Sequence, residues 1–583
     1  MSQSTVTLTK PRETVRVTFP DHLVLEASVG TTIESFLHAH CQQAPDQYES
    51  PYMAAILDSR LRELAYPVKR DANLEPVLLS NSDGGRIYRR SLVLLLVTAI
   101  DELWPGTIVN VSYAVPDGGF YCLLPHRAPF DEDALKRLDA HMHAIAAEDN
   151  PISKRHATLE EAVSLFGERG DEDKVRLMEQ RTRHGLVLYT LRNRSDYYFG
   201  YMVPSTGYLK HFRLVKMPSG FILQYPTRDD TKLPEIIPNS TKIGAMFEQA
   251  EEWLQRIGVE DIGRLNQIVR QDRIQELILV NEALHEQQIA RCARTIYDAH
   301  HERGLRLVII AGPSSSGKTT FSKRLALQLL AHGLRPFTLE LDNYFLDREL
   351  TPKDEEGNFD FEALEAINLP LFNTQLLQLI QGIEVQLPRF DFVLGKSVEG
   401  PIGRLTDNQI LIIEGIHGLN PTLVTKIPPA KIYRIYVSAL TQLNVDAHNR
   451  VSTTDVRMLR RICRDAVQRG HNATATINRW PSVRRGEKRN IFPFQENADV
   501  MFNSALTYEL AALRPLVEPY LLQVEPDTRP YIEANRLLSF LRWVQPFTPT
   551  QQALIPDTSL LREFIGGSIL QNYQPGDLNT KDI

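Results

Sequence analysis

The first part of the chain alternates apolar and polar positions with the period of two that is typical of β-strands. Val15, Val17 and Phe19 fall on one side of such a strand, and residues 22–26 repeat the alternation after a turn. This pattern predicts a β-hairpin at the start of a small β-grasp domain over residues 12–80. The other elements expected in this domain are a short helix over 33–40 and strands near 54–59 and 74–80.

Mixed patterns follow over residues 81–240 and predict an α/β segment without a low-complexity linker. Its expected elements are helices over 88–103, 131–147 and 158–166 and strands near 185–192 and 220–226. Residues 241–303 then show apolar positions at helical spacing with charged residues between them, which predicts a helical connector.

After residue 304 continuous apolar runs alternate with longer amphipathic stretches. Such runs are typical of parallel strands that helices cover on both faces. We therefore expect a doubly wound α/β domain over 304–525 and a mainly helical tail over 526–583. The predicted fold class is α/β and multidomain. The predicted parallel strands are 305–312, 335–342, 409–416, 431–439 and 498–505.

Composition agrees with a soluble globular chain, because 43% of its residues are hydrophobic and 23% are charged. The longest apolar run, over 91–100, is too short to span a bilayer, and the N-terminus has no apolar core of signal-peptide type. The four cysteines are widely scattered, which predicts neither a disulfide framework nor a zinc site. A net charge of -7 gives no general attraction to nucleic acid. We expect a cytoplasmic protein whose only metal is the Mg²⁺ of a bound nucleotide.

The stretch "GPSSSGKTT" fits the phosphate-binding pattern G-x-x-x-x-G-K-[ST] and lies between an apolar strand and an amphipathic helix. Backbone N–H groups of such a loop converge on phosphate oxygens, and the helix dipole favours negative charge. Lys318 is expected to reach the β- and γ-phosphates of ATP, and Thr319 to bind Mg²⁺. The predicted nucleotide-binding residues are Gly312, Ser314, Ser315, Ser316, Gly317, Lys318, Thr319 and Thr320.

Two acids end the predicted strands that follow. Asp342 ends one in "LELDNYF", and Glu414 ends another in "ILIIEGIHG". Ligands of such sheets bind at the carboxyl ends of the strands, so Asp342 is placed to take the proton of an acceptor hydroxyl and Glu414 to hold Mg²⁺. The alternative for each is a carboxylate that only caps a turn or a helix.

Five arginines occupy a predicted helix and its exit in "VRMLRRICRDAVQRG". The first four are spaced i, i+3, i+4 and i+7, so they share one helix face. A solvated basic face is one interpretation. The other is a lid whose guanidinium groups clamp the polyphosphate and the moving phosphoryl group. These residues are Arg457, Arg460, Arg461, Arg464 and Arg469.

With these motifs in order, residues 304–510 resemble the uridine kinase and phosphoribulokinase family of P-loop kinases. The motifs that carry the resemblance are "GPSSSGKTT", "LDNYF", "GNFDFEALEAINLP", "PRFDF", "IIEGIHG", "VRMLRRICRDAVQRG" and "ENADVMFNSA". The resemblance implies that transfer is catalysed by Asp342, Lys318, Arg464 and Arg469. It implies that the acceptor is bound by Asp360, Phe390, Asp391, Arg457 and Arg461.

The acceptor site departs from this family at two positions. Phe390 stands where uridine-cytidine kinases commonly have tyrosine, and Gly395 stands at the nearby histidine position. A polar group normally reads the edge of a base, and these two positions lack one. The resemblance therefore implies phosphotransfer without fixing a pyrimidine acceptor.

The front half resembles two modules of threonyl-tRNA synthetase. Residues 12–80 resemble the TGS domain, and 81–240 resemble the second additional, editing domain through "DGGRIYRRS", "GFYC" and "VPSTGYLKHFRL". The positions of the editing site's His, His, Cys and His hold Arg90, Leu94, Tyr198 and Met202. These residues form no plausible zinc ligand set, so we expect the editing chemistry to be absent. A structural or regulatory appendage and an RNA contact both stay open for this half.

We therefore expect an ATP- and Mg²⁺-dependent kinase that transfers the γ-phosphoryl group to the 5′-hydroxyl of a uridine- or cytidine-like nucleoside. One alternative is a sugar or sugar-phosphate kinase of the phosphoribulokinase type. Another is an RNA-associated regulator that binds ATP and meets tRNA through the synthetase-like domains. The expected partner is a small molecule, no membrane contact is expected, and the sequence gives no oligomeric state.

Overall fold

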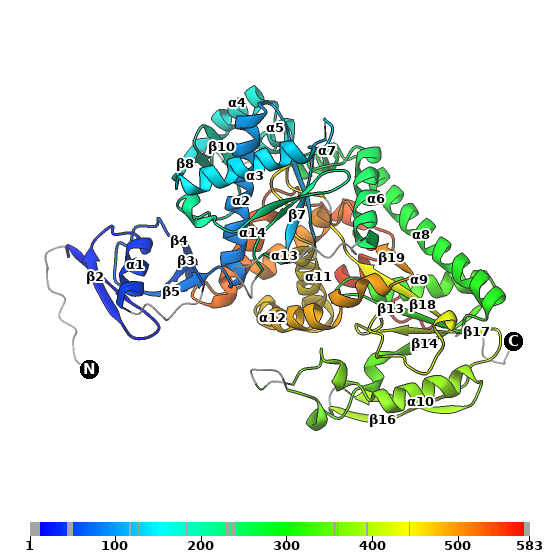
Figure 1. The fold of residues 1–583 in the computed structure, drawn as a ribbon. Coiled ribbons are helices and arrows are strands. Elements are labelled where there is room, and N and C mark those ends of the chain that lie inside the picture. Colours follow the sequence, from blue (N-terminus) through cyan, green and yellow to red (C-terminus); the bar gives the residue numbers. More distant parts are fainter. Residues whose placement is uncertain are drawn as a thin grey trace. The chain divides into compact units, whose positions relative to one another are not determined.

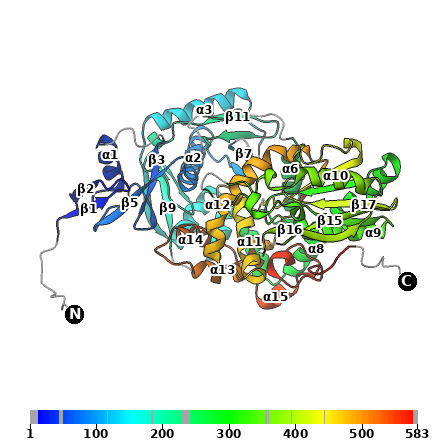
Figure 2. The same ribbon diagram turned by 90° about the horizontal axis from the view of Figure 1, so that it is seen from below.

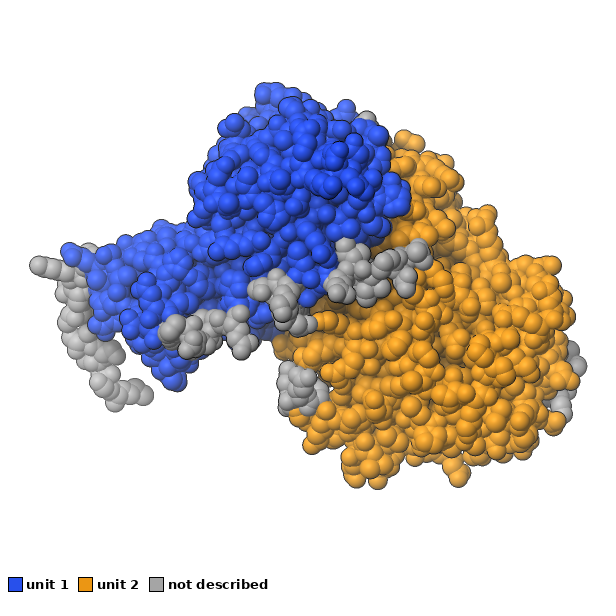
Figure 3. Space-filling view, viewed as in Figure 1, with its two compact units in different colours: residues 1–237, 445–450, 524–543 blue, residues 238–444, 451–523, 544–583 orange. Residues whose placement is uncertain are grey.

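The computed structural model describes residues 12–43, 50–115, 118–125, 127–181, 185–227, 233–234, 241–353, 357, 359–391, 394–441 and 443–575. The chain forms two compact units (Figure 3). Unit 1 comprises residues 1–237, 445–450 and 524–543. Unit 2 comprises residues 238–444, 451–523 and 544–583. Two residues of the quoted motifs lie outside the described residues: Asn358 of "GNFDFEALEAINLP" and Phe392 of "PRFDF".

Unit 1 begins with a five-stranded sheet in the order β2-β1-β5-β3-β4 (Figure 2). Its strands are β1 (Thr14–Thr18), β2 (Val24–Ser28), β3 (Tyr52–Leu57), β4 (Arg60–Glu63) and β5 (Ala72–Leu78), with helix α1 (Ile33–Gln43). The predicted hairpin is confirmed, because β1 and β2 pair antiparallel, while β1 and β5 run parallel. Val15, Val17 and Phe19 are buried, as their alternation predicted.

The remainder of unit 1 contains a four-stranded sheet, β11-β12-β7-β6, and a three-stranded sheet, β10-β9-β8. The predicted helices are present as α2 (Ser82–Leu103), α3 (Glu132–Ala147) and α4 (Leu159–Arg169). The sequence did not predict α5 (Glu172–Glu179), whose charged composition hides its apolar positions. The strands are β6 (Asn110–Val115), β7 (Gly119–Leu123), β8 (Ile152–Thr158), β9 (Gly185–Leu191), β10 (Arg194–Tyr197), β11 (Arg213–Lys216) and β12 (Phe221–Gln224).

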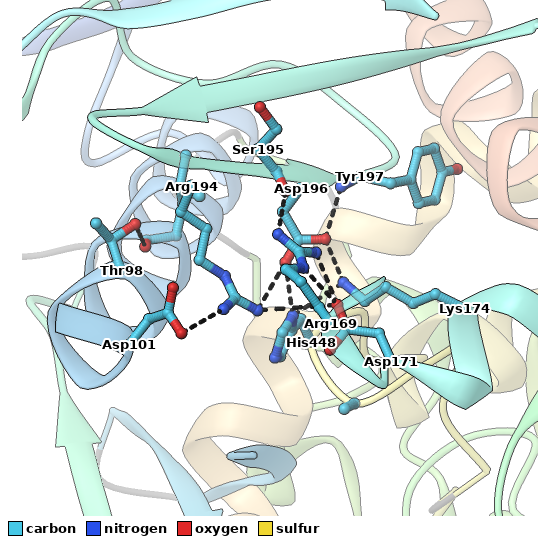
Figure 4. Close-up of polar contacts among 12 residues, drawn as sticks. Thr98, Asp101, Arg169, Asp171, Lys174, Arg194, Ser195, Asp196, Tyr197 and His448 are labelled. Carbon is cyan, nitrogen blue, oxygen red and sulfur yellow. Dashed lines mark hydrogen bonds and ion pairs between the residues drawn. The ribbon is translucent and has the colours of Figure 1, made fainter. Parts of the chain in front are cut away.

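A buried ionic cluster holds residues 445–450 in unit 1 (Figure 4). The ammonium of Lys174 contacts Asp196 and lies 2.9 Å from His448 Nδ1, which in turn is 2.8 Å from Asp196 Oδ2. Burial alone would lower the pKa of Lys174, but the charges of Asp196 and Asp446 hold it above its ordinary value. Likewise burial alone would raise the pKa of Asp196, but Lys174 and His448 hold it well below the usual range. The cluster therefore ties a short segment to elements that lie far away in the sequence.

Unit 2 is built on a parallel five-stranded sheet in the order β14-β17-β13-β18-β19 (Figure 1). All four neighbouring pairs are parallel, which confirms the predicted doubly wound fold. The strands are β13 (Leu307–Ala311), β14 (Arg335–Glu340), β17 (Gln409–Glu414), β18 (Ile432–Ser438) and β19 (Val500–Asn503). Glu414 is in register with Ile310 and with Glu340, so the carboxyl ends of β13, β14 and β17 meet at one edge.

Helices and one additional hairpin complete unit 2. The predicted connector is present as α6 (Thr241–Ile257), α7 (Ile262–Arg270) and α8 (Ile274–Arg303). The hairpin, β15 (Val385–Asp391) with β16 (Lys396–Gly403), was not predicted. The other helices of unit 2 are α9 (Lys318–Ala331), α10 (Leu369–Ile380), α11 (Thr453–Gln468), α12 (Ala473–Asn490), α13 (Glu509–Leu522), α15 (Pro549–Ala553) and α16 (Arg562–Ile565).

The segment after residue 523 is divided between the units, since α14 (Arg529–Leu541) belongs to unit 1 and residues 544–583 to unit 2. Within the described part of the chain, none of the helices combines the length and apolar character needed to cross a bilayer.

Candidate active site

The loop after β13 has the backbone conformation of a phosphate cradle. Ser315 and Gly317 adopt positive φ angles of 57° and 87°, and α9 begins directly afterwards at Lys318. A Cβ at Gly312 would lie 2.0 Å from the carbonyl oxygen of Val437, so only glycine allows this close approach of two backbones. The loop thus turns tightly and presents N–H groups ahead of a helix N-terminus.

The protein's own carboxylates occupy two of these N–H groups. The backbone N–H of Ser314 donates to Glu487 Oε1 over 3.2 Å, and that of Thr320 donates to Glu563 Oε2 over 3.1 Å. The hydroxyls of Ser315 and Ser316 are buried and find no hydrogen-bond partner among the described residues. The loop therefore accepts anions and keeps unused donors, which fits the phosphates of a nucleotide.

Glu563 belongs to a C-terminal segment that packs directly on the loop. Glu563 also accepts a 2.9 Å hydrogen bond from Thr320 Oγ1, and a Cβ on Gly317 would lie 2.3 Å from Leu560 Cδ2. The backbone carbonyl of Glu563 accepts a 2.7 Å hydrogen bond from Gln468 Nε2 of α11. The sequence offered no signal for this contact, because Glu563 lies 243 residues from Thr320 in the chain.

Glu563 should compete with a bound nucleotide, because its negative charge takes the N–H of Thr320 that a phosphate would otherwise use. We expect Glu563→Ala to tighten the binding of Mg²⁺·ATP by roughly five- to thirty-fold, which is about 1–2 kcal/mol. Equilibrium titration with a fluorescent ATP analogue measures this change. Asp557→Asn is the matched control, since Asp557 is an acid of the same segment whose side chain is 65% exposed. Weaker binding by Glu563→Ala would contradict competition.

Thr319 and Glu414 lie together, as their assignment to Mg²⁺ requires. Thr319 Oγ1 donates to Glu414 Oε1 over 3.0 Å. Burial raises the pKa of Glu414 to about 7; Lys318 opposes this rise, and Glu563 and Asp342 add to it. A hydroxyl and a partly buried carboxylate at a phosphate loop are oxygen ligands that suit Mg²⁺. The charge of the ion would relieve the repulsion among Glu414, Glu563 and Asp342.

Asp342 lies on the first turn after β14 and belongs to the same electrostatic neighbourhood. The residue is exposed, but desolvation by neighbouring atoms and the charge of Glu340 raise the pKa of its carboxyl, while Lys318 and Arg469 lower it. A carboxylate that faces solvent beside the phosphate loop can accept the proton of an incoming hydroxyl. Asp342 follows the end of β14, which is in register with the end of β17 that carries Glu414, and the charges of Lys318 and Arg469 act on Asp342.

Glu362 is a further acid of this neighbourhood that the sequence did not single out. Burial raises its pKa to about 7, with Arg461 and Lys318 opposing and Asp342 adding to the rise. The Glu362 N–H donates to Asp360 Oδ1 over 3.1 Å, so Asp360 caps the turn that carries Glu362. The available signal was the place of Glu362 in "NFDFEALEA", two residues after the singled-out Asp360.

The arginines of α11 divide into two groups. Arg457 and Arg460 are fully buried: Arg457 pairs with Glu487 over 2.9 Å, and Arg460 pairs with Glu509 over 2.8 Å. Arg457 also donates to the carbonyl of Ser314 over 3.0 Å. Neither a solvated face nor a mobile lid describes these two side chains, which fix α11 to the rest of unit 2.

The other three arginines are closer to the expected clamp. Arg461 donates to Ser314 Oγ over 3.0 Å, and Arg464 lies 3.9 Å from Glu563. Burial lowers the pKa of Arg464 to about 10, which still leaves it charged at neutral pH. Arg469, at the end of α11, is 52% exposed and 3.4 Å from Asp465. All three lie within 4 Å of the buried Asp465, at 3.4, 3.8 and 3.4 Å, so a bound phosphate would compete with this carboxylate for them.

Phe390 and Asp391 occupy the end of β15. Phe390 is buried against Phe345 with their ring centroids 5.7 Å apart, and it belongs to the hydrophobic core. Asp391 accepts from the Leu394 N–H over 2.9 Å and closes the turn of the hairpin. A Cβ at Gly395 would lie 2.8 Å from the Arg348 guanidinium, which thus lies where a larger side chain would project.

The chain is similar to two groups of known proteins. Residues 307–511 match the family model described as Phosphoribulokinase / Uridine kinase family, which confirms the resemblance of this region. The threonine–tRNA ligases of Parabacteroides distasonis and Marinobacter nauticus are 25% and 31% identical, over 36% and 29% of this chain. The chain spans less than a third of these relatives, 31% and 26% of their lengths.

Two solved kinase structures are also similar to the chain. A putative fructose transport system kinase from Silicibacter has 21% identity and a TM-score of 0.26, covering 37% of this chain and 98% of its own. A possible uridine kinase from Bacillus stearothermophilus has 18% identity and a TM-score of 0.27, with the same two coverages.

Proposed function

We propose, from the match of residues 307–511 to the phosphoribulokinase and uridine kinase family, that the protein is an ATP-dependent kinase with an alcohol acceptor. The observation that carries the proposal is the convergence of Lys318, Thr319, Asp342 and Glu414 at the phosphate loop. Asp342 orients the acceptor hydroxyl and takes its proton. Lys318, Arg464 and Arg469 stabilise the negative charge of the phosphoryl group in transit.

Thr319 and Glu414 would hold Mg²⁺, which supplies positive charge to the phosphate oxygens. The loop residues Gly312 and Ser314 to Thr320 bind the phosphates of ATP through their N–H groups. Arg457 acts indirectly, because its guanidinium holds the Ser314 carbonyl and Glu487 in place. Arg461 contacts Ser314 Oγ, from which it can reach either the nucleotide or the acceptor.

The acceptor in this proposal is a ribonucleoside phosphorylated at its 5′-hydroxyl. Asp360 lies on the turn that also carries Glu362, so two acids are available to bind the hydroxyls of a sugar. Phe390 offers no polar atom to a base edge, so the proposal includes purine as well as pyrimidine nucleosides. The same proposal includes a small-molecule partner, a cytosolic location and the domain boundaries predicted above.

An acceptor panel tests this assignment. We expect ADP release to rise at least tenfold over the basal rate when uridine, cytidine or adenosine is added, and not when ribose, ribulose 5-phosphate or tRNA is added. Coupled-enzyme measurement of ADP follows the reaction. Stimulation by a sugar phosphate alone would assign the chain to the phosphoribulokinase type instead.

A second candidate function is an RNA-associated regulator, favoured by the similarity to threonine–tRNA ligases. Leu94, Tyr198 and Met202 are buried in the hydrophobic core of unit 1, so these positions offer no hydrolytic group. Turnover of ATP that responds to tRNA and ignores every small alcohol would support this function over the kinase.

A further inference from the structure

Unit 1 contains a cavity that is separate from the phosphate loop. Its volume is about 330 Å³, and it is lined by residues of β4, α2, the segment after β10 and α14. All of its lining residues belong to unit 1, whereas the phosphate loop belongs to unit 2. Five arginines and one aspartate provide its charged side chains: Arg60, Arg62, Arg86, Arg90, Arg536 and Asp83.

Two of the arginines are held by carboxylates. Arg86 lies 2.7 Å from Asp83 and 3.2 Å from Glu533, and Arg536 lies 2.7 Å from Glu533. Burial alone would raise the pKa of Glu533, but Arg536 and Arg86 lower it to about 2. Glu533 therefore stays ionised at neutral pH and fixes both guanidinium groups at the wall of the cavity.

Arg62 and Arg90 have no carboxylate partner among the described residues. Arg90 Nη1 donates to the carbonyl of Tyr201 over 2.6 Å, and Arg62 Nη1 lies 3.3 Å from the Tyr201 hydroxyl. Desolvation lowers the pKa of Arg90 to about 10. The charges of Arg536 and Arg86 lower this pKa further, while Tyr189 raises it. Arg90 therefore remains charged at neutral pH beside other cations, an arrangement that a bound anion would stabilise.

Gly200 leaves space for the Arg90 guanidinium, because it has no side chain. Gly200 has a φ angle of 135°, and a Cβ there would lie 2.6 Å from Arg90 Cζ. The aromatic residues Phe199, Tyr201 and Tyr531 line the same cavity. The cavity thus combines guanidinium groups that lack a carboxylate partner among the described residues with aromatic surfaces against which a flat ring can pack.

We infer that this cavity binds a phosphorylated small molecule with a flat ring, of the size of a nucleoside monophosphate. Guanidinium groups match phosphate oxygens in charge and in their paired N–H geometry. Arg62 and Arg90 each use Nη1 for a hydrogen bond to a neutral oxygen and have no carboxylate partner among the described residues, so their positive charges stay uncompensated. The volume falls within the range of about 300–1,000 Å³ that is typical of small-molecule sites. The inference is independent of the proposed kinase activity, since no residue of the phosphate loop contributes to the cavity.

Calorimetric titration of the full-length Lys318→Ala variant with nucleoside 5′-monophosphates tests this cavity in a protein whose phosphate loop lacks its lysine. We expect saturable binding of at least one monophosphate, and at least tenfold weaker binding of the matching nucleoside. Arg62→Gln and Arg90→Gln in that background should each weaken binding by about ten- to a hundred-fold. Arg70→Gln is the matched control, because Arg70 is 80% exposed and does not line the cavity.

Thermal unfolding of each variant separates loss of the site from loss of the fold. Arg62 is partly exposed, so Arg62→Gln should keep the parental melting temperature and serves as the deciding variant if Arg90→Gln unfolds. Binding that Arg62→Gln leaves unchanged would overturn the inference. So would the absence of saturable binding by any monophosphate, or binding of tRNA where no free nucleotide binds.

Discussion

Replacing Asp342 with Asn should lower kcat by about two to four orders of magnitude and change the Kd for ATP by less than about threefold. Asn has the shape of Asp but cannot take the proton of an acceptor hydroxyl. Asp342 is exposed on the first turn after β14 and forms no buried ion pair with a described residue, so its replacement should not disturb the fold. Single-turnover kinetics with saturating ATP isolate the chemical step.

The matched control is Glu349→Gln, an exposed acid a short distance further along the chain. It should keep the kcat of the parent protein. An Asp342→Asn variant with parental kcat would remove Asp342 from the chemistry and leave it as a turn residue. A variant that lost ATP binding together with kcat would assign Asp342 to the metal and nucleotide site instead.

Lys174→Met should destabilise unit 1 by about 3–5 kcal/mol. The change leaves Asp196 buried and without its ammonium partner, although His448, Arg194 and the Tyr197 N–H still contact it. Urea unfolding, followed by the fluorescence of a tryptophan of unit 1 such as Trp543, measures the loss. Lys210→Met, at an exposed position of the same unit, should change stability by less than about 0.5 kcal/mol.

A double variant sharpens this test. Lys174→Met with Asp196→Leu removes both charges and should recover a large part of the loss, since an apolar pair avoids the cost of a buried lone carboxylate.

The pKa of Asp196 is held below its usual range, so the contribution of its carboxylate to the stability of unit 1 should be complete above about pH 4 and lost as the pH falls further. If Lys174→Met alone lowered the free energy of unfolding by less than about 1 kcal/mol, the cluster would not anchor the 445–450 segment.

The local motifs of the kinase region were readable from the sequence because each depends on neighbouring residues. The apolar strand, the glycine loop and the following helix are consecutive, so β13 and α9 could be placed without knowing the fold. Asp342 and Glu414 could be placed together because parallel strands end at one edge, as the register of β14 and β17 shows. Their meeting with Lys318 follows from that topology.

The remaining features depend on contacts between distant residues, which one sequence does not reveal. From the sequence alone Arg460 is interpreted as a basic surface residue. In the structure it is buried and pairs with Glu509, which lies 49 residues later in the chain. Nothing in the tail marks Glu563 as a partner of Thr320. The β15–β16 hairpin was missed because β16 mixes polar residues, glycine and proline, although its backbone pairs with β15 on both sides of a register shift at Gln386–Pro388.

The most direct test of the central claim is to follow the labelled γ-phosphate of ATP and identify the molecule that carries it. With the parent protein, Mg²⁺ and a mixture of ribonucleosides, the account predicts a labelled nucleoside 5′-monophosphate that disappears in Lys318→Ala and Asp342→Asn. Label found only in inorganic phosphate, at a rate that tRNA raises and nucleosides leave unchanged, would contradict it.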